Sequence, residues 1–313
     1  MNIDFRDINV AEELAACETS DMLAPIDLVA RVEARRAAKD HGIQLPWSKL
    51  SGLFSLRSGE VVLLGGYTGH FKSTITTQIG LAALRQGFNV GVASLELLAE
   101  DVVEQYAEMS AVCAEPPMKY VSAFAEWASG RLHIYDRVDA IRPDEAIQMV
   151  IAFAKYKRCK LVVLDALMMM GVCDDLERER DFTQTLAAVA KKFGICVLLV
   201  HHVRKPDRDG EAKVPGKYDF IGSSHLANVA ASIVIVWHDK RKAEKAALIA
   251  RGIEVEDFDD DRPDMLFKVA KQRYAAYEGS VGLWRHERCR AFCGSSARQI
   301  AHTDLAIVRG VAA

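Results

Sequence analysis

The chain has 313 residues, half of them hydrophobic, with 40 basic and 43 acidic side chains and a formal net charge of −3. This length and composition predict a globular protein with a large buried core. A mildly acidic balance excludes a broadly basic surface, so any nucleic-acid binding must be local. No run of about 18 apolar residues occurs, which excludes a membrane-spanning helix, and we expect a cytoplasmic protein.

The seven cysteines are scattered along the chain, several of them inside apolar runs. This distribution is typical of reduced thiols in a core rather than of a disulfide framework. Cys289 and Cys293 have no second pair to complete a zinc site, so we expect no structural metal there.

Residues 1–45 are expected to form an N-terminal segment with a linker helix over residues 26–40. The apolar stripe of this helix consists of Leu28, Val29 and Val32 and is too narrow to build a domain. The helix could dock on a neighbouring subunit or pack on the core of its own chain, and the sequence leaves both open.

Residues 61–74 predict a buried strand that runs into a phosphate-binding loop. The pattern G-x-x-x-x-G-K-[ST] is matched at Gly66, Lys72 and Ser73. In such loops backbone N–H groups surround a phosphate at the N-terminus of the next helix, here expected over residues 75–85. Lys72 would reach the terminal phosphates, and the Ser73 hydroxyl would coordinate Mg²⁺. The residues expected to bind the nucleotide are Gly66, Thr68, Gly69, His70, Phe71, Lys72, Ser73 and Thr74.

One residue of this loop departs from the pattern. Phe71 stands where the second glycine belongs and could crowd the phosphate cradle. Taken alone, the segment could also be an ordinary glycine-rich turn between a strand and a helix.

After the loop, short apolar runs alternate with longer helical patterns. The runs cover residues 89–94, 132–135, 160–165, 195–201 and 232–237, and the helical patterns lie near 100–112, 143–156, 178–193 and 239–250. This alternation predicts an α/β domain with a mostly parallel central sheet flanked by helices. Residues 265–273, 281–285 and 288–292 are expected as antiparallel strands that close the domain. The domain would span residues 46–294, followed by a tail over residues 295–313.

Polar side chains at the ends of the expected strands are candidates for the site, because ligands of parallel sheets bind at that edge. Asp165 ends an apolar strand, as does the carboxylate that holds Mg²⁺ through water in nucleotide hydrolases. Glu96 could accept a proton from an attacking water, or it could be a solvated loop acid. His201 and His202 are adjacent in a strand, so only one of them can face the nucleotide.

In this order the motifs resemble the RecA-like motor domain of DnaB-type replicative helicases, above all phage-encoded forms and the related mitochondrial helicase. The resemblance spans about residues 43–292 and implies a RecA-like P-loop NTPase core. By this resemblance Glu96 is the general base, Asp165 binds the metal, and His202 senses the γ-phosphate. The resemblance rests on the following segments: Leu-Arg57-Ser-Gly-Glu60, the phosphate loop, Ser94-Leu-Glu96, Val-Leu-Asp165, Leu-Leu-Val-His-His202, the segment from Phe220 to Val234, and Val-Ala-Lys271-Gln-Arg273.

The resemblance also implies a ring of subunits that share their sites. Lys271 and Arg273 correspond to cations that reach the nucleotide of the adjacent subunit, where a guanidinium stabilises charge developing in phosphoryl transfer. The polar loop between His202 and Phe220 corresponds to a loop that holds single-stranded DNA in a central channel. Its basic residues are Arg204, Lys205, Arg208, Lys213 and Lys217.

The sequence therefore favours a DNA helicase that forms a ring, expected to be a hexamer, and uses ATP and Mg²⁺ to translocate on single-stranded DNA during replication. A primase or other replisome proteins would be its partners, in a bacterial or phage-infected cytosol. The alternatives are a RecA- or KaiC-like ATPase, and a nucleotide- or DNA-binding accessory protein that has lost turnover, for which Phe71 is the best support.

Overall fold

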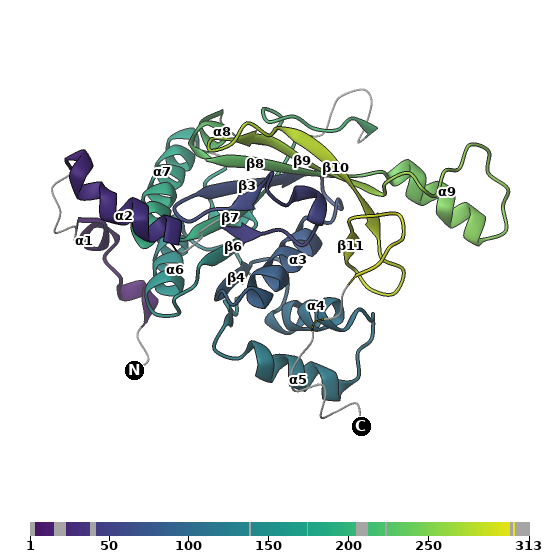
Figure 1. The fold of residues 1–313 in the computed structure, drawn as a ribbon, viewed down its shortest axis with the longest axis horizontal. Coiled ribbons are helices and arrows are strands. Elements are labelled where there is room, and N and C mark those ends of the chain that lie inside the picture. Colours follow the sequence, from purple (N-terminus) through teal and green to yellow (C-terminus); the bar gives the residue numbers. More distant parts are fainter. Residues whose placement is uncertain are drawn as a thin grey trace.

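The computed structural model describes residues 4–15, 23–37, 42–137, 139–173, 175–204, 212–222, 224–300 and 303. Within these residues a nine-stranded sheet forms the centre of the molecule (Figure 1). Its parallel strands are β3 (Val61–Gly66), β4 (Val90–Ser94), β5 (Leu132–Ile134), β6 (Leu161–Asp165), β7 (Cys196–His202) and β8 (Ser232–His238). The antiparallel strands are β9 (Met265–Gln272), β10 (Gly279–Arg285) and β11 (Phe292–Cys293).

The strand order across the sheet is β11-β10-β9-β8-β3-β7-β6-β4-β5. The strand that precedes the phosphate loop, β3, lies between β7 and β8 near the middle. The predicted α/β architecture with a mostly parallel sheet is confirmed. The expected strand over residues 288–292 is wrong in extent, because residues 286–291 form a turn stabilised by a hydrogen bond from the His286 N–H to the Ala291 carbonyl.

Helices cover both faces of the sheet because its central strands are apolar on both sides. In β3, Val62 and Leu64 pack into one core and Val61 and Leu63 into the other. The first core is covered by α3 (Lys72–Arg85), α4 (Ala99–Ala111) and α5 (Met118–Ala128). The second is covered by α6 (Pro143–Lys155), α7 (Leu176–Phe193) and α8 (Ser224–Val229).

The N-terminal part carries η1 (Phe5–Asp7), α1 (Val10–Ala15) and α2 (Pro25–Ala37) at one side of the domain (Figure 1). Ile26 is 74 % exposed and Val29 is 44 % exposed, so the described α2 leaves apolar side chains uncovered by its own chain. A short antiparallel pair, β1 (Ile43–Gln44) with β2 (Ser55–Leu56), and the turns η2 (Ser48–Leu50) and η3 (Leu167–Met170) complete the described elements.

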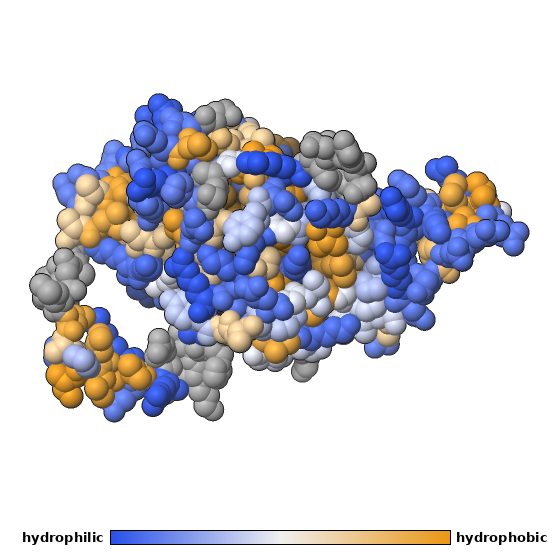
Figure 2. Space-filling model, turned by 90° about the horizontal axis from the view of Figure 1, so that it is seen from above, coloured by the Kyte–Doolittle hydropathy of each residue, from blue (hydrophilic) through white to orange (hydrophobic). Residues whose placement is uncertain are grey.

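An arm projects from the opposite side of the domain (Figure 1). It begins with α9 (Lys240–Ala250) and returns to the sheet at β9. Apolar residues gather near its end and on the N-terminal helices at the other extreme of the molecule (Figure 2). The exposed large apolar residues of the arm include Leu248, Ile249 and Ile253. Among the described helices, none has the length and apolar character needed to cross a membrane.

Candidate functional site

The loop after β3 forms the centre of the candidate site. Gly66 ends the strand, and a Cβ at this position would lie 2.7 Å from the Val236 carbonyl oxygen, so only glycine fits. Thr68 and Gly69 are exposed at the bend, and Lys72 begins α3. The backbone thus passes from a buried strand into the N-terminus of a 14-residue helix, the arrangement that suits an anion.

The side chain of His70 connects this loop to the end of β8. Its side chain is fully buried, and its Nδ1 accepts a hydrogen bond of 3.0 Å from the backbone N–H of His238 at the end of β8. The side chain of His70 therefore faces the protein, and only its backbone is placed to serve a ligand.

Phe71 occupies the conformation that explains why glycine is usual at this position. Its φ of 60° and ψ of 30° lie in the left-handed region, which costs a residue with a Cβ about 1–2 kcal/mol. Its ring packs edge-on against His238 at 4.8 Å and Phe292 at 5.4 Å between centroids. The guanidinium of Arg285 lies 5.4 Å from the ring centroid. Phe71 is thus anchored on the end of the sheet by these contacts, which offset its backbone strain.

Replacing Phe71 with glycine should lower the melting temperature and, if the chain hydrolyses ATP as the sequence resemblance implies, leave the rate close to that of the unchanged protein. The substitution relieves the left-handed strain but removes the ring from its packing site, and packing of a large aromatic side chain outweighs about 1 kcal/mol. Thermal unfolding and a steady-state assay check both parts. Activity that emerges only in Phe71→Gly would instead identify the unchanged chain as an accessory protein without turnover.

The Lys72 ammonium group lies inside the loop. Its side chain donates hydrogen bonds to the carbonyl oxygens of Gly66 at 3.2 Å and Tyr67 at 3.0 Å, and it contacts Nδ1 of His202 at 3.1 Å. Burial lowers the pKa of Lys72, while Asp165 and Glu96 act in the opposite direction. Both carboxylates therefore lie close enough to the Lys72 ammonium group to interact with it electrostatically.

The side chains of His202 and His201 lie on opposite faces of the strand, as strand geometry requires. His202 lies beside Lys72 and Thr68, whereas His201 is fully buried and its Nε2 bonds to the Ile221 carbonyl at 2.7 Å. Burial and the neighbouring Lys72 lower the pKa of His202 to about 4, so its ring is neutral near pH 7. Because an ammonium group only donates, the Nδ1 of His202 accepts and the ring proton belongs on Nε2.

Asp165 and Ser73 form the oxygen pair expected to hold Mg²⁺. Asp165 ends β6, is 4 % exposed, and accepts a hydrogen bond from the Ser73 side chain. Burial raises the pKa of Asp165 to about 6, and the nearby Glu96 adds to this rise. A hydroxyl and a carboxylate are hard oxygen donors that suit Mg²⁺, which usually takes few protein ligands and completes its shell with phosphate and water. The described residues contain no cluster of three or more His, Cys, Asp or Glu side chains, and such a site needs none.

Glu96 lies on the exposed turn between β4 and α4. β4 pairs with β6 so that Ser94 lies opposite Asp165, and the backbone N–H of Leu95 donates to the Asp165 carbonyl at 2.7 Å. This register places Glu96 at the same edge of the sheet as Lys72 and Asp165. The structure therefore brings together Lys72, Ser73, Thr68, Glu96, Asp165 and His202.

Lys271 and Arg273 lie at the opposite edge. β9 runs antiparallel to β8, and the Arg273 N–H donates to Ala231, whose own N–H donates to Val61 at the start of β3. The length of β3, about 17 Å, thus separates Arg273 from the phosphate loop of its own chain. Lys271 donates to the carbonyls of Ala227, Asn228 and Ala230 at 2.7–3.2 Å, and the Arg273 side chain also donates to Asn228.

The described part of the basic segment after β7 contacts β7 and the phosphate loop. Val203 pairs with Phe220, and the Tyr67 hydroxyl donates to the Lys213 carbonyl at 3.2 Å. Arg204 and Lys213 are exposed, and Lys217 is half-buried with its ammonium group 5.6 Å from the centroid of Tyr218. Lys205 and Arg208 lie outside the described residues.

Sequence reasoning missed the role of one buried acid. Glu60, directly before β3, is 3 % exposed and lies near Arg57 and Arg273. The available signal was an acid immediately ahead of a wholly apolar strand, but its proximity to Arg273 depends on tertiary structure.

The fold is that of a RecA-like P-loop NTPase domain. The family model described as AAA domain matches residues 35–208, which is more than half of the chain, and the protein belongs to this family. Membership of this family implies nucleotide binding. None of the curated proteins compared with the chain matches it.

The fold also occurs in solved structures of helicases. The ATPase domain of a phage helicase superposes with a TM-score of 0.69 at 15 % identity, covering 88 % of this chain and 99 % of that one. A DnaB-like replicative helicase, described together with its interactions with primase, gives a TM-score of 0.66 at 14 % identity, covering 89 % of this chain and 68 % of that one. The expected RecA-like fold of DnaB-type helicases is thus confirmed.

Proposed function

We propose that the protein is a ring-forming ATPase that translocates on single-stranded DNA and acts as a helicase in replication. The observation that carries this proposal is the division of the expected catalytic groups between two edges of one sheet. Lys72, Ser73 and Asp165 lie at one edge, and Lys271 and Arg273 lie at the other. A complete site therefore needs two copies of the chain.

At the phosphate loop each residue has a distinct task. Lys72 exchanges its carbonyl partners for the β- and γ-phosphates of ATP. The Ser73 hydroxyl and, through water, Asp165 would hold Mg²⁺, which would supply neutralisation of the charge on these phosphates. Glu96 orients the attacking water and accepts its proton, for which its place on an exposed turn gives access to solvent. The neutral His202 ring donates its Nε2 proton towards the γ-phosphate.

The second subunit contributes the cations. In a head-to-tail arrangement the Arg273 edge of one protomer faces the phosphate loop of the next, and Lys271 and Arg273 stabilise the charge of phosphoryl transfer. An exposed guanidinium at a strand end is suited to this delivery. Repetition of such a contact closes a ring if the rotation per subunit allows it. We propose six subunits in the cytosol of a bacterium or phage-infected cell.

The basic loop is the proposed DNA-binding element. Six copies of Arg204, Lys213 and Lys217 would give a positive channel on a mildly acidic particle. The contact between Tyr67 and Lys213 connects this loop to the phosphate loop, which supports coupling of DNA binding to hydrolysis. The primase interactions described for one structural neighbour support a primase as a further partner.

Replacing Lys213 and Lys217 together with alanine should weaken binding of single-stranded DNA and reduce its salt dependence. Each lost phosphate contact lowers the slope of log K against log salt by about 0.7. Fluorescence anisotropy of a labelled oligonucleotide at several salt concentrations measures this slope. The control is the alanine pair at Lys119 and Lys157, which are exposed lysines away from the loop. An unchanged slope in the Lys213/Lys217 variant would exclude the loop from the DNA contact.

The proposed function is tested by ATP hydrolysis with and without single-stranded DNA, and by native mass with an ATP analogue and oligonucleotide. We expect DNA to accelerate turnover and the ligands to stabilise a closed oligomer. A protein that hydrolyses ATP at full speed as a monomer, or that never binds ATP, would contradict the proposal. Hydrolysis and assembly without strand separation would favour a RecA- or KaiC-like ATPase instead.

A further inference from the structure

A buried carboxylate lies at the sheet edge that carries Arg273. The side chain of Glu60 is 4 % exposed, and its Oε1 is 3.4 Å from Nε of Arg57. Its Oε2 accepts a hydrogen bond of 3.4 Å from the Ser232 hydroxyl. The charge of Arg273 also favours the ionised form of Glu60. Because Glu60 directly precedes β3, the whole strand separates it from the phosphate loop.

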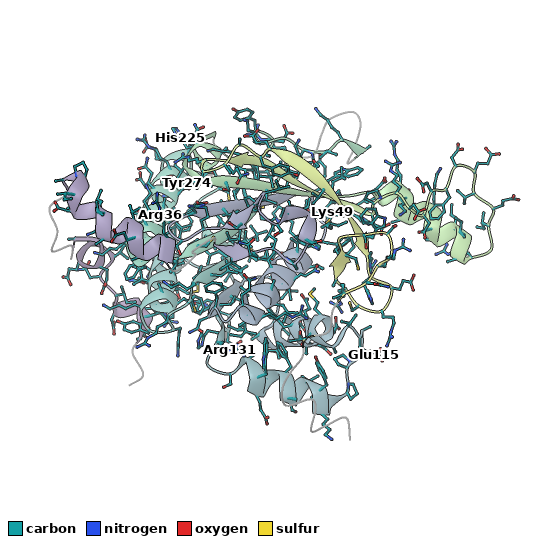
Figure 3. The ribbon with its side chains drawn as sticks, viewed as in Figure 1. Arg36, Lys49, Glu115, Arg131, His225 and Tyr274 are labelled. Carbon is teal, nitrogen blue, oxygen red and sulfur yellow. The ribbon has the colours of Figure 1, made fainter. Side chains whose placement is uncertain are left out.

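A series of contacts links Glu60 to the segment that presents Arg273. The Arg57 guanidinium that pairs with Glu60 lies 5.0 Å from the ring centroid of Tyr274, the residue after Arg273. Tyr274 lies at this edge, on the side away from α9 (Figure 3). Glu60, Asn228, Arg273 and Tyr274 line one cavity of about 480 Å³. The turn after β9 is thus held from one side by Arg57 and from the other by the carbonyl groups of Asn228 in α8 and Ala231 just beyond it.

We propose that Glu60 is a positioning residue for Arg273: through Arg57 and Tyr274 it fixes the turn that presents the guanidinium to the phosphate loop of the adjacent subunit. This inference rests on the proposed function. Glu60 touches neither the nucleotide nor the reacting atoms in this arrangement. Its effect is on the rate of the chemical step and not on the affinity of its own protomer for ATP.

The protonation state of Glu60 gives this role a pH dependence. Burial raises the pKa of Glu60 to about 7, opposed by Arg57, Ser232 and Arg273. The charged or titratable groups around it in the described residues are Arg57 on its own loop, Arg273 and Tyr274 beyond β9, Cys196 in β7 and Lys191 of α7 across the cavity. Only the ionised carboxylate pairs with Arg57, so kcat should rise as the pH increases through about 7.

The test replaces Glu60 with glutamine, which keeps the size of the side chain and removes its charge. We expect the DNA-stimulated kcat to fall by about 10- to 100-fold, the cost of a small misplacement of a catalytic group, with unchanged ATP affinity. The rise of kcat through pH 7 should also be lost. The matched control is Glu108→Gln, because Glu108 is another buried glutamate with an arginine partner, Arg290 at 3.1 Å, and lies far from this edge on α4. Glu108→Gln should retain both kcat and its pH profile.

A mixing experiment separates positioning from general damage. Glu60→Gln protomers keep an intact phosphate loop, and Lys72→Ala protomers keep an intact Arg273 edge. Mixed assemblies of these two variants should regain activity, because Lys72→Ala subunits supply well-placed arginines to Glu60→Gln sites. Absence of rescue, or wild-type kcat in Glu60→Gln, overturns the inference. Absence of ATP hydrolysis in the unchanged protein overturns the proposed function itself.

A second variant keeps the inference testable if Glu60→Gln fails to fold. Tyr274 is 65 % exposed, so its replacement with alanine removes the contact with Arg57 at little cost to the core. Tyr274→Ala should show the same loss of kcat and the same rescue by Lys72→Ala. Tyr156→Ala, which removes another exposed tyrosine beside a cation, should be unaffected. Equal activity of the two tyrosine variants counts against the role of this contact.

Discussion

Replacing Arg273 with alanine is expected to lower the DNA-stimulated kcat of ATP hydrolysis by about 10³-fold or more. The guanidinium is required only where charge develops during phosphoryl transfer, so the affinity of the same protomer for ATP should not change. Equilibrium binding of a fluorescent ATP analogue and single-turnover hydrolysis measure the two quantities separately. Arg178→Ala provides a control, because Arg178 is an exposed arginine on α7.

The decisive form of this experiment mixes two inactive variants. Lys72→Ala removes the lysine that would bind the phosphates at one edge of the sheet. Arg273→Ala removes the guanidinium at the other edge. If neighbours share sites, mixed assemblies contain some complete sites and recover part of the activity. Wild-type turnover in Arg273→Ala would refute the shared site, and failure of the mixture to recover would indicate that both residues act within one chain.

Replacing Glu96 with glutamine should reduce kcat by about 10²- to 10⁴-fold, the usual contribution of a general base. The amide keeps the shape of the side chain but cannot accept the proton of the attacking water, so ATP and Mg²⁺ binding should persist. Rapid-quench measurement of a single turnover reports the chemical step directly.

Glu100→Gln is the matched control for Glu96. Glu100 is an exposed acid in the first turn of α4, where acids stabilise the N-terminus of a helix. Its replacement should leave kcat unchanged. If the Glu96 and Glu100 variants hydrolyse ATP equally well, Glu96 is a solvated loop acid and another group activates the water.

The parallel sheet could be predicted from the sequence because its strands are apolar on both faces. The runs expected over residues 160–165 and 195–201 correspond closely to β6 and β7, and the helix after the phosphate loop begins at Lys72, three residues before its expected start. α5 was not predicted, although Val121, Phe124 and Ala128 have helical spacing.

In the candidate site, local sequence patterns predict the position of some residues, whereas the contacts of others depend on tertiary structure. A motif can place Lys72, Ser73 and Asp165 at the carboxyl edge of a sheet, since that follows from chain direction alone. The surroundings of Phe71 depend on β8 and β11, which lie more than 150 residues further along the chain. Likewise, the link from Glu60 to Tyr274 joins segments that only the antiparallel return of β9 brings together.

The placement of the two halves of the site on opposite edges has a kinetic consequence. If Arg273 serves the neighbouring subunit as proposed, a single copy of the chain carries the phosphate loop at one edge and the activating arginine at the other, so it cannot complete its own site. Specific activity should therefore climb with protein concentration until association saturates. In that arrangement, dilute and unassembled copies would bind nucleotide without hydrolysing it.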